Sequence, residues 1–294
     1  MRLQDLGGNP VRWWGRVTAA VIVLLVWLLA TVCLVPMSAH AETWNHRAYV
    51  SLAKNSPAKS KYVQGVCYDG TRYAYVVKQN SSKHQMLWRA DMNKGGKAVK
   101  LNVSAKAKRA IYHGNDLEFV RVDGKSYLLV APCKAKSRYL VVLRVSGRKV
   151  WFDHRIYCGF TDKVSAIAKV SQDGNRVKVI MGRNSKLWMV TLDLRFSVPY
   201  KVHGRVYGYH ANQGIGYKDG YLLTCSGGYT TKLGTVRKLR LAKSGSHWNL
   251  HQVWSRHIKG ECEGAFFDKA GKVCVACEGK WHWNYSDRMV RWGK

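Results

Sequence analysis

The sequence predicts an all-β fold, and three observations support this prediction. The motif Tyr112-His113-Gly114-Asn115-Asp116 returns as Tyr209-His210-Ala211-Asn212-Gln213, which indicates an internal repeat. Short runs of β-branched and aromatic residues recur, separated by Gly, Asp, Asn and Lys, as is typical of strands and turns. No helical period of useful length follows the N-terminal apolar segment.

The repeat has a period of about 50 residues, the length of one four-stranded propeller blade. Each copy begins with a polar anchor residue, and the spacings between successive anchors are 52, 49, 48 and 50. The anchors are Gln64, Asp116, Ser165, Gln213 and Glu263. We therefore predict a five-bladed β-propeller with four-stranded blades over residues 42–294.

Within the first repeat, the predicted strands are 66–68, 73–78, 86–91 and 99–103. A tight turn is expected between the first and second strands of every repeat. These turns are Asp69-Gly70, Asp123-Gly124, Asp173-Gly174, Asp219-Gly220 and Ala270-Gly271.

The last repeat ends without a fourth strand, because the chain stops soon after residues 288–292. The segment before the first repeat begins Trp44-Asn45-His46-Arg47 and resembles Trp248-Asn249-Leu250-His251, the start of a predicted fourth strand. We therefore assign residues 44–52 as the outer strand of the fifth blade. This N-terminal strand would close the ring and cover an exposed sheet edge.

Residues 1–41 have the pattern of a secretion signal. Arg12 and Arg16 precede an uncharged apolar stretch at 17–35, and Pro36 and the triplet Ala39-His40-Ala41 follow it. The apolar stretch is long enough for an uncleaved membrane anchor to remain the alternative. Either reading predicts a secreted or cell-surface protein.

The chain is strongly basic. Removing residues 1–41 takes away Arg2, Arg12, Arg16 and Asp5, which lowers the formal net charge from +32 to +30. A field of this size attracts polyanions. Outside a cell these are teichoic acids, anionic polysaccharides, anionic lipid headgroups and nucleic acid, and charge alone does not rank them.

Seven of the eight cysteines follow the leader, so at least one thiol is expected to be free and at most two disulfides are expected. Cys274 and Cys277 form a C-x-x-C pair with His282 beyond them. This pair lies in an apolar, strand-like run without a second ligand pair, which favours buried cysteines over a zinc site.

The first strand of each propeller blade lines the central channel, so the anchors should form a polar ring near one mouth. We predict a ligand site there, with paired histidines and asparagines from the second and fourth blades. The alternative is that these polar groups bond only to backbone and ordered water. The predicted ligand-binding residues are Gln64, His113, Asn115, Asp116, His210, Asn212, Gln213 and Glu263.

An acidic cluster of Asp116, Glu261 and Glu263, extended by Glu118, stands out in a chain with few acids. Paired carboxylates serve as acid and base in glycoside hydrolysis, so Asp116, Glu261 and Glu263 are the candidate catalytic residues. The same three are the candidate metal ligands, because carboxylates with amide oxygens from Asn115 or Gln213 suit calcium.

Common nucleophile, metalloprotease and nucleotide-binding motifs are absent from the sequence, so no nucleotide cofactor is expected. The run Trp281-His282-Trp283-Asn284-Tyr285 combines aromatic and polar side chains. It suits stacking on sugars or bases, or simple packing at a blade edge.

The Gln-Gly pairs at Gln64 and Gln213, the His113 to Asp116 motif and the Glu-x-Glu of Glu261 to Glu263 resemble a known group. This group is the secreted five-bladed propellers of Gram-positive bacteria related to helveticin-type bacteriocins and to phage receptor-binding and teichoic-acid-biosynthesis propellers. The resemblance implies a five-bladed fold and contact with cell-wall polymers or glycans. It transfers no catalytic residue, and the third repeat, at Ser165, departs from the pattern.

The function predicted from the sequence is that of a secreted, cationic, monomeric protein that binds an anionic cell-wall polymer or polysaccharide through the channel mouth. The alternative is a polysaccharide hydrolase that uses the mouth carboxylates, with or without calcium.

Overall fold

The computed structural model describes residues 48–51, 60–80, 85–93, 96–134, 138–183, 186–208, 213–227, 233–259, 261–278, 280–281, 284–285 and 288–291 of the 294-residue chain. The chain divides into the units Met1–Thr43 and Trp44–Lys294, and every described residue lies in the second. The predicted signal or anchor at residues 1–41 lies outside the described residues. In the part of the chain that is described, no helix has the length and hydropathy of a membrane span.

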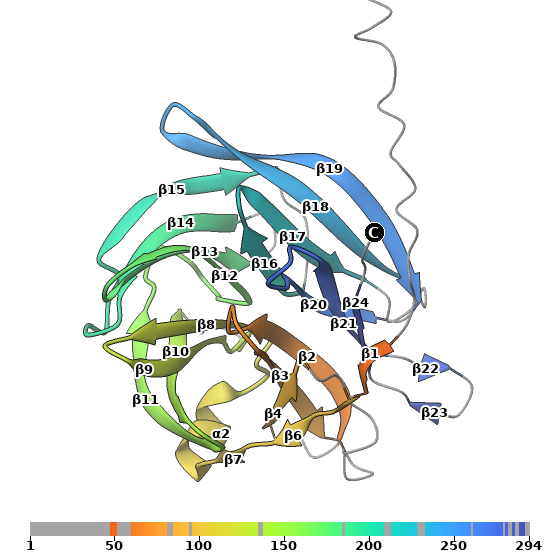
Figure 1. Cartoon of the computed structure of the whole chain (residues 1–294). Helices are drawn as coiled ribbons and strands as arrows, with labels where there is room; N and C mark the ends of the chain where they lie inside the picture. Colours follow the sequence, from red (N-terminus) through yellow and green to blue (C-terminus); the bar gives the residue numbers. More distant parts are fainter. Residues whose placement is uncertain are drawn as a thin grey trace, which may run out of the picture. The chain divides into compact units, whose positions relative to one another are not determined.

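The described part is nearly all β-strand, arranged as successive antiparallel meanders (Figure 1). The first meander contains β2 (Ser60–Tyr68), β3 (Tyr73–Asn80), β4 (Gln85–Asp91) and β6 (Val99–Lys100). The second contains β8 (Asp116–Val122), β9 (Lys125–Ala131), β10 (Tyr139–Ser146) and β11 (Lys149–Tyr157), to which β7 (Asn102–Val103) adds in parallel. The third contains β12 (Ala166–Asp173), β13 (Arg176–Arg183), β14 (Lys186–Asp193) and β15 (Lys201–Tyr207). The fourth contains β16 (Ile215–Lys218), β17 (Tyr221–Ser226), β18 (Leu233–Ser244) and β19 (His247–Lys259). The final sheet has the order β20 (Glu261–Phe267), β21 (Val273–Glu278), β24 (Arg288–Arg291), β1 (Ala48–Ser51) and β5 (Gly96–Lys97).

The hydrogen-bonded sheets are less uniform than four strands each. Val206 pairs with Trp248 and Tyr207 with Asn249, so β15 and β19 join the third and fourth meanders into one eight-stranded sheet. The other large sheets have four or five strands. The difference arises because outer strands pair across the boundary between neighbouring meanders.

The segment around residues 99–111 differs from the prediction. The expected strand at 99–103 is divided into β6, which pairs with β4, and β7, which pairs with β11. A helix, α2 (Ala105–Ile111), follows where none was predicted. The Oγ of Ser104 caps it by accepting a hydrogen bond from the amide of Ala107 at 3.3 Å. The helix escapes a search for periodicity because it spans only seven residues.

The predicted turns are present at the expected places between strands. Gly70, Gly124, Gly174, Gly220 and Gly271 all have positive φ angles. Two of these turns also place the preceding Asp123 and Asp219 at φ 49°, a conformation that Asp tolerates better than most residues.

The N-terminal strand pairs with the last sheet, as predicted, but it is not the outermost strand, because β5 pairs in parallel with its other edge. β1 pairs antiparallel with β24, with Ala48 opposite Val290 and Ser51 opposite Arg288. This pairing covers the edge that β24 would otherwise expose.

The first strands of the meanders contact one another in a closed series, β2 with β8, β8 with β12, β12 with β16, β16 with β20 and β20 with β2 (Figure 1). Buried apolar clusters fill the spaces between neighbouring meanders. Tyr75 stacks on Phe119 between the first and second meanders, and Tyr68 stacks on Phe266 between the first and last. In both pairs the ring centroids are 5.6 Å apart.

Between β21 and β24 the chain forms a small hairpin of β22 (Lys280–Trp281) and β23 (Asn284–Tyr285). The predicted stacking role of this Trp-rich segment concerns side chains that lie outside the described part.

Candidate functional site

Asp116 lies at the start of β8 and ties three inner strands together. Its Oδ2 accepts hydrogen bonds from the amides of Ile167 on β12, at 2.8 Å, and Ile215 on β16, at 2.9 Å. Its Oδ1 accepts a third from the amide of Leu117 at 2.9 Å. The side chain has no solvent exposure. Burial raises the pKa of Asp116 well above its ordinary value, while the three amides lower it.

Glycines let the inner strands approach Asp116 closely. A Cβ placed on Gly65 would lie 2.4 Å from the Cα of Asp116, and one on Gly214 would lie 2.7 Å from its Oδ1. The amide of Gly214 also donates to the carbonyl of Glu263 at 2.9 Å. At the level of the anchors the inner strands are therefore in backbone contact, and side chains larger than glycine do not fit at these positions.

The remaining predicted mouth residues are mostly buried. Gln64 is 5% exposed, Asn115 3% and Glu263 2%. Asn115 uses its Nδ2 to donate to the carbonyl of Ser165 at 2.8 Å, and Gln64 uses its Nε2 to donate to the carbonyl of Val63 at 2.7 Å. Both are hydrogen bonds from a buried side chain to backbone, which is the alternative to the predicted ligand site.

The half-buried members of the predicted mouth are His113, Gln213 and Glu261. Gln213 donates from Nε2 to Oε1 of Glu261 at 3.3 Å. Burial, helped by the charge of Lys163, lowers the pKa of His113, so its imidazole is neutral at pH 7. His210 and Asn212 lie outside the described residues.

The structure gathers no metal site from the predicted ligands. Over the described residues, no group of three or more His, Cys, Asp or Glu side chains is placed to hold a metal ion. The carboxylate of Asp116 is directed at backbone amides instead.

None of the seven cysteines between Trp44 and Lys294 forms a disulfide. Cys274 and Cys277 are buried within β21, which agrees with buried cysteines rather than a zinc site. The upper limit of two disulfides is also respected.

A pocket opens at the other end of the inner strands, downstream of the anchors. Its volume is about 240 Å³, and every inner strand contributes to its lining. We call it the axial pocket. Its side chains include Tyr68, Glu118, Lys169, Tyr217, Lys218 and Phe266. Apart from Glu118, none of these residues was predicted from the sequence. Each lies two to five residues after the anchor of its own strand.

The polar groups of the axial pocket are held in place by backbone contacts. Glu118 accepts hydrogen bonds from the amides of Phe119, at 2.8 Å, and Lys169, at 2.6 Å. The Nζ of Lys169 donates to the carbonyl of Phe119 at 3.0 Å. Burial raises the pKa of Glu118, and the charge of Lys169 opposes that rise. A carboxylate and an ammonium are thus each fixed by backbone groups in the lining of the same pocket.

Lys218 is held in a similar way. Its Nζ donates to the carbonyls of Asp268, at 3.0 Å, and Lys269, at 2.9 Å. An ammonium has three donors, so Lys169 and Lys218 each keep capacity for a ligand oxygen. The stacked rings of Tyr68 and Phe266 supply the apolar wall. A concave site with aromatic walls and a few fixed polar groups is typical of small-ligand pockets.

No protein-family model matches the sequence, and no curated protein matches it. Solved structures do match. The tail fiber of Staphylococcus aureus phage P68 aligns with a TM-score of 0.54 at 12% identity, covering 85% of this chain and 53% of the fiber chain. The fold is that of a β-propeller.

A second similar structure is the GH43_1 enzyme from Xanthomonas citri complexed with xylotriose. It aligns with a TM-score of 0.52 at 10% identity, covering 86% of this chain and 92% of the enzyme. At such low identity these likenesses establish the propeller fold alone.

Proposed function

We propose that this protein is a secreted, cationic, monomeric five-bladed propeller that binds an anionic glycan or cell-envelope polymer. The closed series of inner strands and the apolar clusters between meanders support five blades. The predicted leader and the resemblance to secreted helveticin-type propellers support export.

One observation carries the proposed binding function, namely that the axial pocket combines the half-buried rings of Tyr68 and Tyr217 with a fixed carboxylate and a fixed ammonium. A sugar or polyol hydroxyl can donate to Glu118 while it accepts from Lys169. Sugar rings pack well against aromatic walls. The pocket therefore suits a polyhydroxylated ligand.

The charge of the molecule supplies attraction over a longer range. A formal net charge of +32, or +30 without the leader, draws polyanions to the surface with little regard to their identity. This attraction is screened over about 8 Å at physiological salt. The pocket would then select among the polymers that arrive.

The experiment measures binding of purified teichoic acid and of neutral oligosaccharides to three variants. Lys169→Met keeps the length of the side chain but removes its ammonium, and Lys186→Met removes an exposed lysine elsewhere as the matched control. His113→Ala probes the opposite, predicted mouth. We expect Lys169→Met to change the ranking of ligands and Lys186→Met to leave it unchanged. If only His113→Ala changes the ranking, selection belongs to the mouth predicted from the sequence.

Glycoside hydrolysis is the second candidate function. The observation that favours it is a half-buried carboxylate, Glu118, whose pKa is raised and which lines the pocket. Against it, both oxygens of Glu118 accept backbone amides. Release of reducing ends from anionic polysaccharides, abolished by Glu118→Gln, would establish hydrolysis, and no release by the wild-type protein would exclude it for those substrates.

A further inference from the structure

A second hollow lies between the first and second meanders, apart from the axial pocket. Its volume is about 500 Å³, and it is lined by the β2–β3 turn, β3, β4, β8, β9 and β10. We call it the arginine cleft. Its lining includes the cationic residues Arg72, Arg89, Arg121, Lys125 and Arg144. Arg89 lies opposite Tyr75 and Arg121 lies two residues after Phe119, on the sheet faces that border the cleft. Lys125 and Arg144 lie opposite Val122 and Tyr127, whose side chains pack toward the third meander. The only acidic residue in its lining is Asp69.

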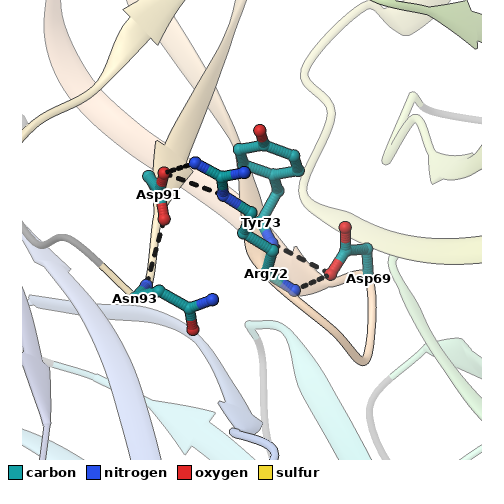
Figure 2. Close-up of polar contacts among 5 residues, drawn as sticks. All are labelled: Asp69, Arg72, Tyr73, Asp91 and Asn93. Carbon is teal, nitrogen blue, oxygen red and sulfur yellow. Dashed lines mark hydrogen bonds and ion pairs between the residues drawn. The ribbon is translucent and has the colours of Figure 1, made fainter.

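Asp69 does not neutralise these cations, because it is engaged by its own turn. Its Oδ1 accepts hydrogen bonds from the amides of Thr71, at 2.8 Å, Arg72, at 2.7 Å, and Tyr73, at 2.9 Å. Figure 2 shows the last two of these bonds. The carboxylate therefore shapes the turn at the rim of the cleft.

Arg72 is the one cation of the cleft with a described carboxylate partner. Its Nε and Nη2 donate to Oδ2 of Asp91 at 2.9 and 2.6 Å (Figure 2). The backbone amide of Asn93 donates to Oδ1 of Asp91 at 3.1 Å. Within the described residues, no carboxylate forms an ion pair with Arg89, Arg121, Lys125 or Arg144. The guanidinium groups of Arg89 and Arg121 thus share one concavity without a described counter-charge.

Arg89 is fixed in place within the cleft. Its Nη1 donates to the carbonyl of Gly147 at 2.9 Å, and its guanidinium lies 4.2 Å from the ring centroid of Tyr73. Arg121 is exposed on the side of β8 that borders the cleft. Guanidinium groups form paired hydrogen bonds to phosphate oxygens, which makes arginine the preferred residue for such anions.

The aromatic rings of the cleft are already in use. Arg72 and Arg89 both lie over the ring of Tyr73, and Tyr75 and Phe119 are buried against one another. Proteins that bind single-stranded nucleic acid stack bases on accessible aromatic faces. The cleft offers charged donors but no such face, which favours a phosphate chain without bases.

We propose that the arginine cleft binds the phosphodiester groups of a polyol-phosphate or sugar-phosphate chain, with Arg89 and Arg121 as the main donors. This inference rests on the proposed function for the class of ligand, an anionic envelope polymer, but not on the axial pocket. The cleft holds the phosphates, whereas the axial pocket takes hydroxyl-bearing groups.

The test uses the full chain and a synthetic hexamer of glycerol phosphodiester, titrated by calorimetry at 150 mM salt. The cleft variant is Arg89→Gln/Arg121→Gln. The control, Arg183→Gln/Lys186→Gln, removes the same charge from exposed positions at the β13–β14 hairpin. Because each lost charge-assisted hydrogen bond weakens binding substantially, we expect at least about a tenfold loss in the cleft variant and less than about twofold in the control.

Three outcomes would overturn the proposal. Equal losses in the two double variants would mean that only diffuse charge matters. A dT15 oligonucleotide that binds as tightly as the hexamer and responds to the same variants would mean a nucleic-acid site. Loss of hexamer binding in Lys169→Met but not in the cleft variant would place the phosphates in the axial pocket, leaving the proposed function intact.

Thermal unfolding of each variant shows whether it is folded. If the cleft double variant is unfolded, Arg121→Lys replaces it. This change keeps the charge but removes the guanidinium fork, so it should weaken hexamer binding while Arg183→Lys does not. Unchanged binding in Arg121→Lys would then contradict the role given to Arg121.

Discussion

The carboxylate of Asp116 accepts a hydrogen bond at 2.9 Å from the amide of Ile215, which lies 99 residues further along the chain. The same oxygen accepts the amide of Ile167. One buried side chain therefore joins β8, β12 and β16 at the centre of the propeller. Its closest neighbours are the backbones of Gly65 and Gly214, so the group has little room to rearrange.

Asp116→Asn should destabilise the protein with almost no change in volume. The new amide can offer only one oxygen, so its NH₂ group must face backbone donors that the carboxylate satisfied. Hydrogen bonds to charged groups contribute about 1.5–3 kcal/mol, and we expect a loss in this range. Urea denaturation measures it. Asp173→Asn, at an exposed turn, is the control and should change stability by less than about 0.5 kcal/mol.

Gly65→Ala tests the close approach of β2 to β8. The added methyl group would meet the backbone of Asp116, which cannot move aside as a flexible side chain can. Overpacking of this kind costs about 1–3 kcal/mol. Gly174→Asn is the matched control, because nothing lies within 4 Å of a Cβ there and Asn tolerates its φ of 52°. Equal melting temperatures for Gly65→Ala and the wild type would contradict the tight contact.

The repeat, the turns and the closing strand were predictable because each depends on local chemistry. Asp and Gly mark turns by their backbone preferences, and β1 resembles another outer strand in sequence. The partners of Asp116 were not predictable, because the amides of Ile167 and Ile215 leave no signal in residue type. Without these amides in view, the position of Asp116 in the repeat predicts a ligand-binding residue at the channel mouth.

The axial pocket was hidden for a different reason. Glu118 and Lys169 are 51 residues apart and meet only because β8 and β12 lie side by side. Aligning the repeats shows how far along its strand each residue lies, but it does not show at which end the inner strands come into backbone contact. Glycines permit that contact, and the residues that they approach are far away in sequence.

The thiols should differ sharply in reactivity. Of the seven cysteines between Trp44 and Lys294, Cys133 is half-buried and the other six are buried. Burial raises the pKa of Cys158 to about 12 and that of Cys67, Cys225 and Cys262 above the ordinary value, which keeps them protonated and unreactive.

Iodoacetamide should therefore label Cys133 alone among these seven in the folded protein, and all seven in denaturant without a reductant. Mass spectrometry of the tryptic peptides identifies the sites, and Cys133→Ser is the control that should remove the labelling in the native state. Native labelling of Cys225 or Cys262 would show that the interior near β20 opens.

Asp193 should make stability depend on pH in a direction that its contacts fix. Its Oδ1 accepts from Nε of Arg195 at 2.9 Å and its Oδ2 from Nη2 at 2.7 Å, and the carboxylate is 1% exposed. The hydrogen bond from Arg195 lowers the pKa of Asp193 in the folded state.

The contact therefore stabilises the protein above the unfolded pKa of about 4, and the stabilisation is lost as the pH falls through the lower folded pKa. Arg195 is 58% exposed, so screening limits the contribution to about 1 kcal/mol or less. The difference in unfolding free energy between the wild type and Asp193→Asn should be largest near pH 7 and should shrink below pH ~4. A difference that grows as the pH falls would mean that Arg195 does not stabilise the ionised carboxylate.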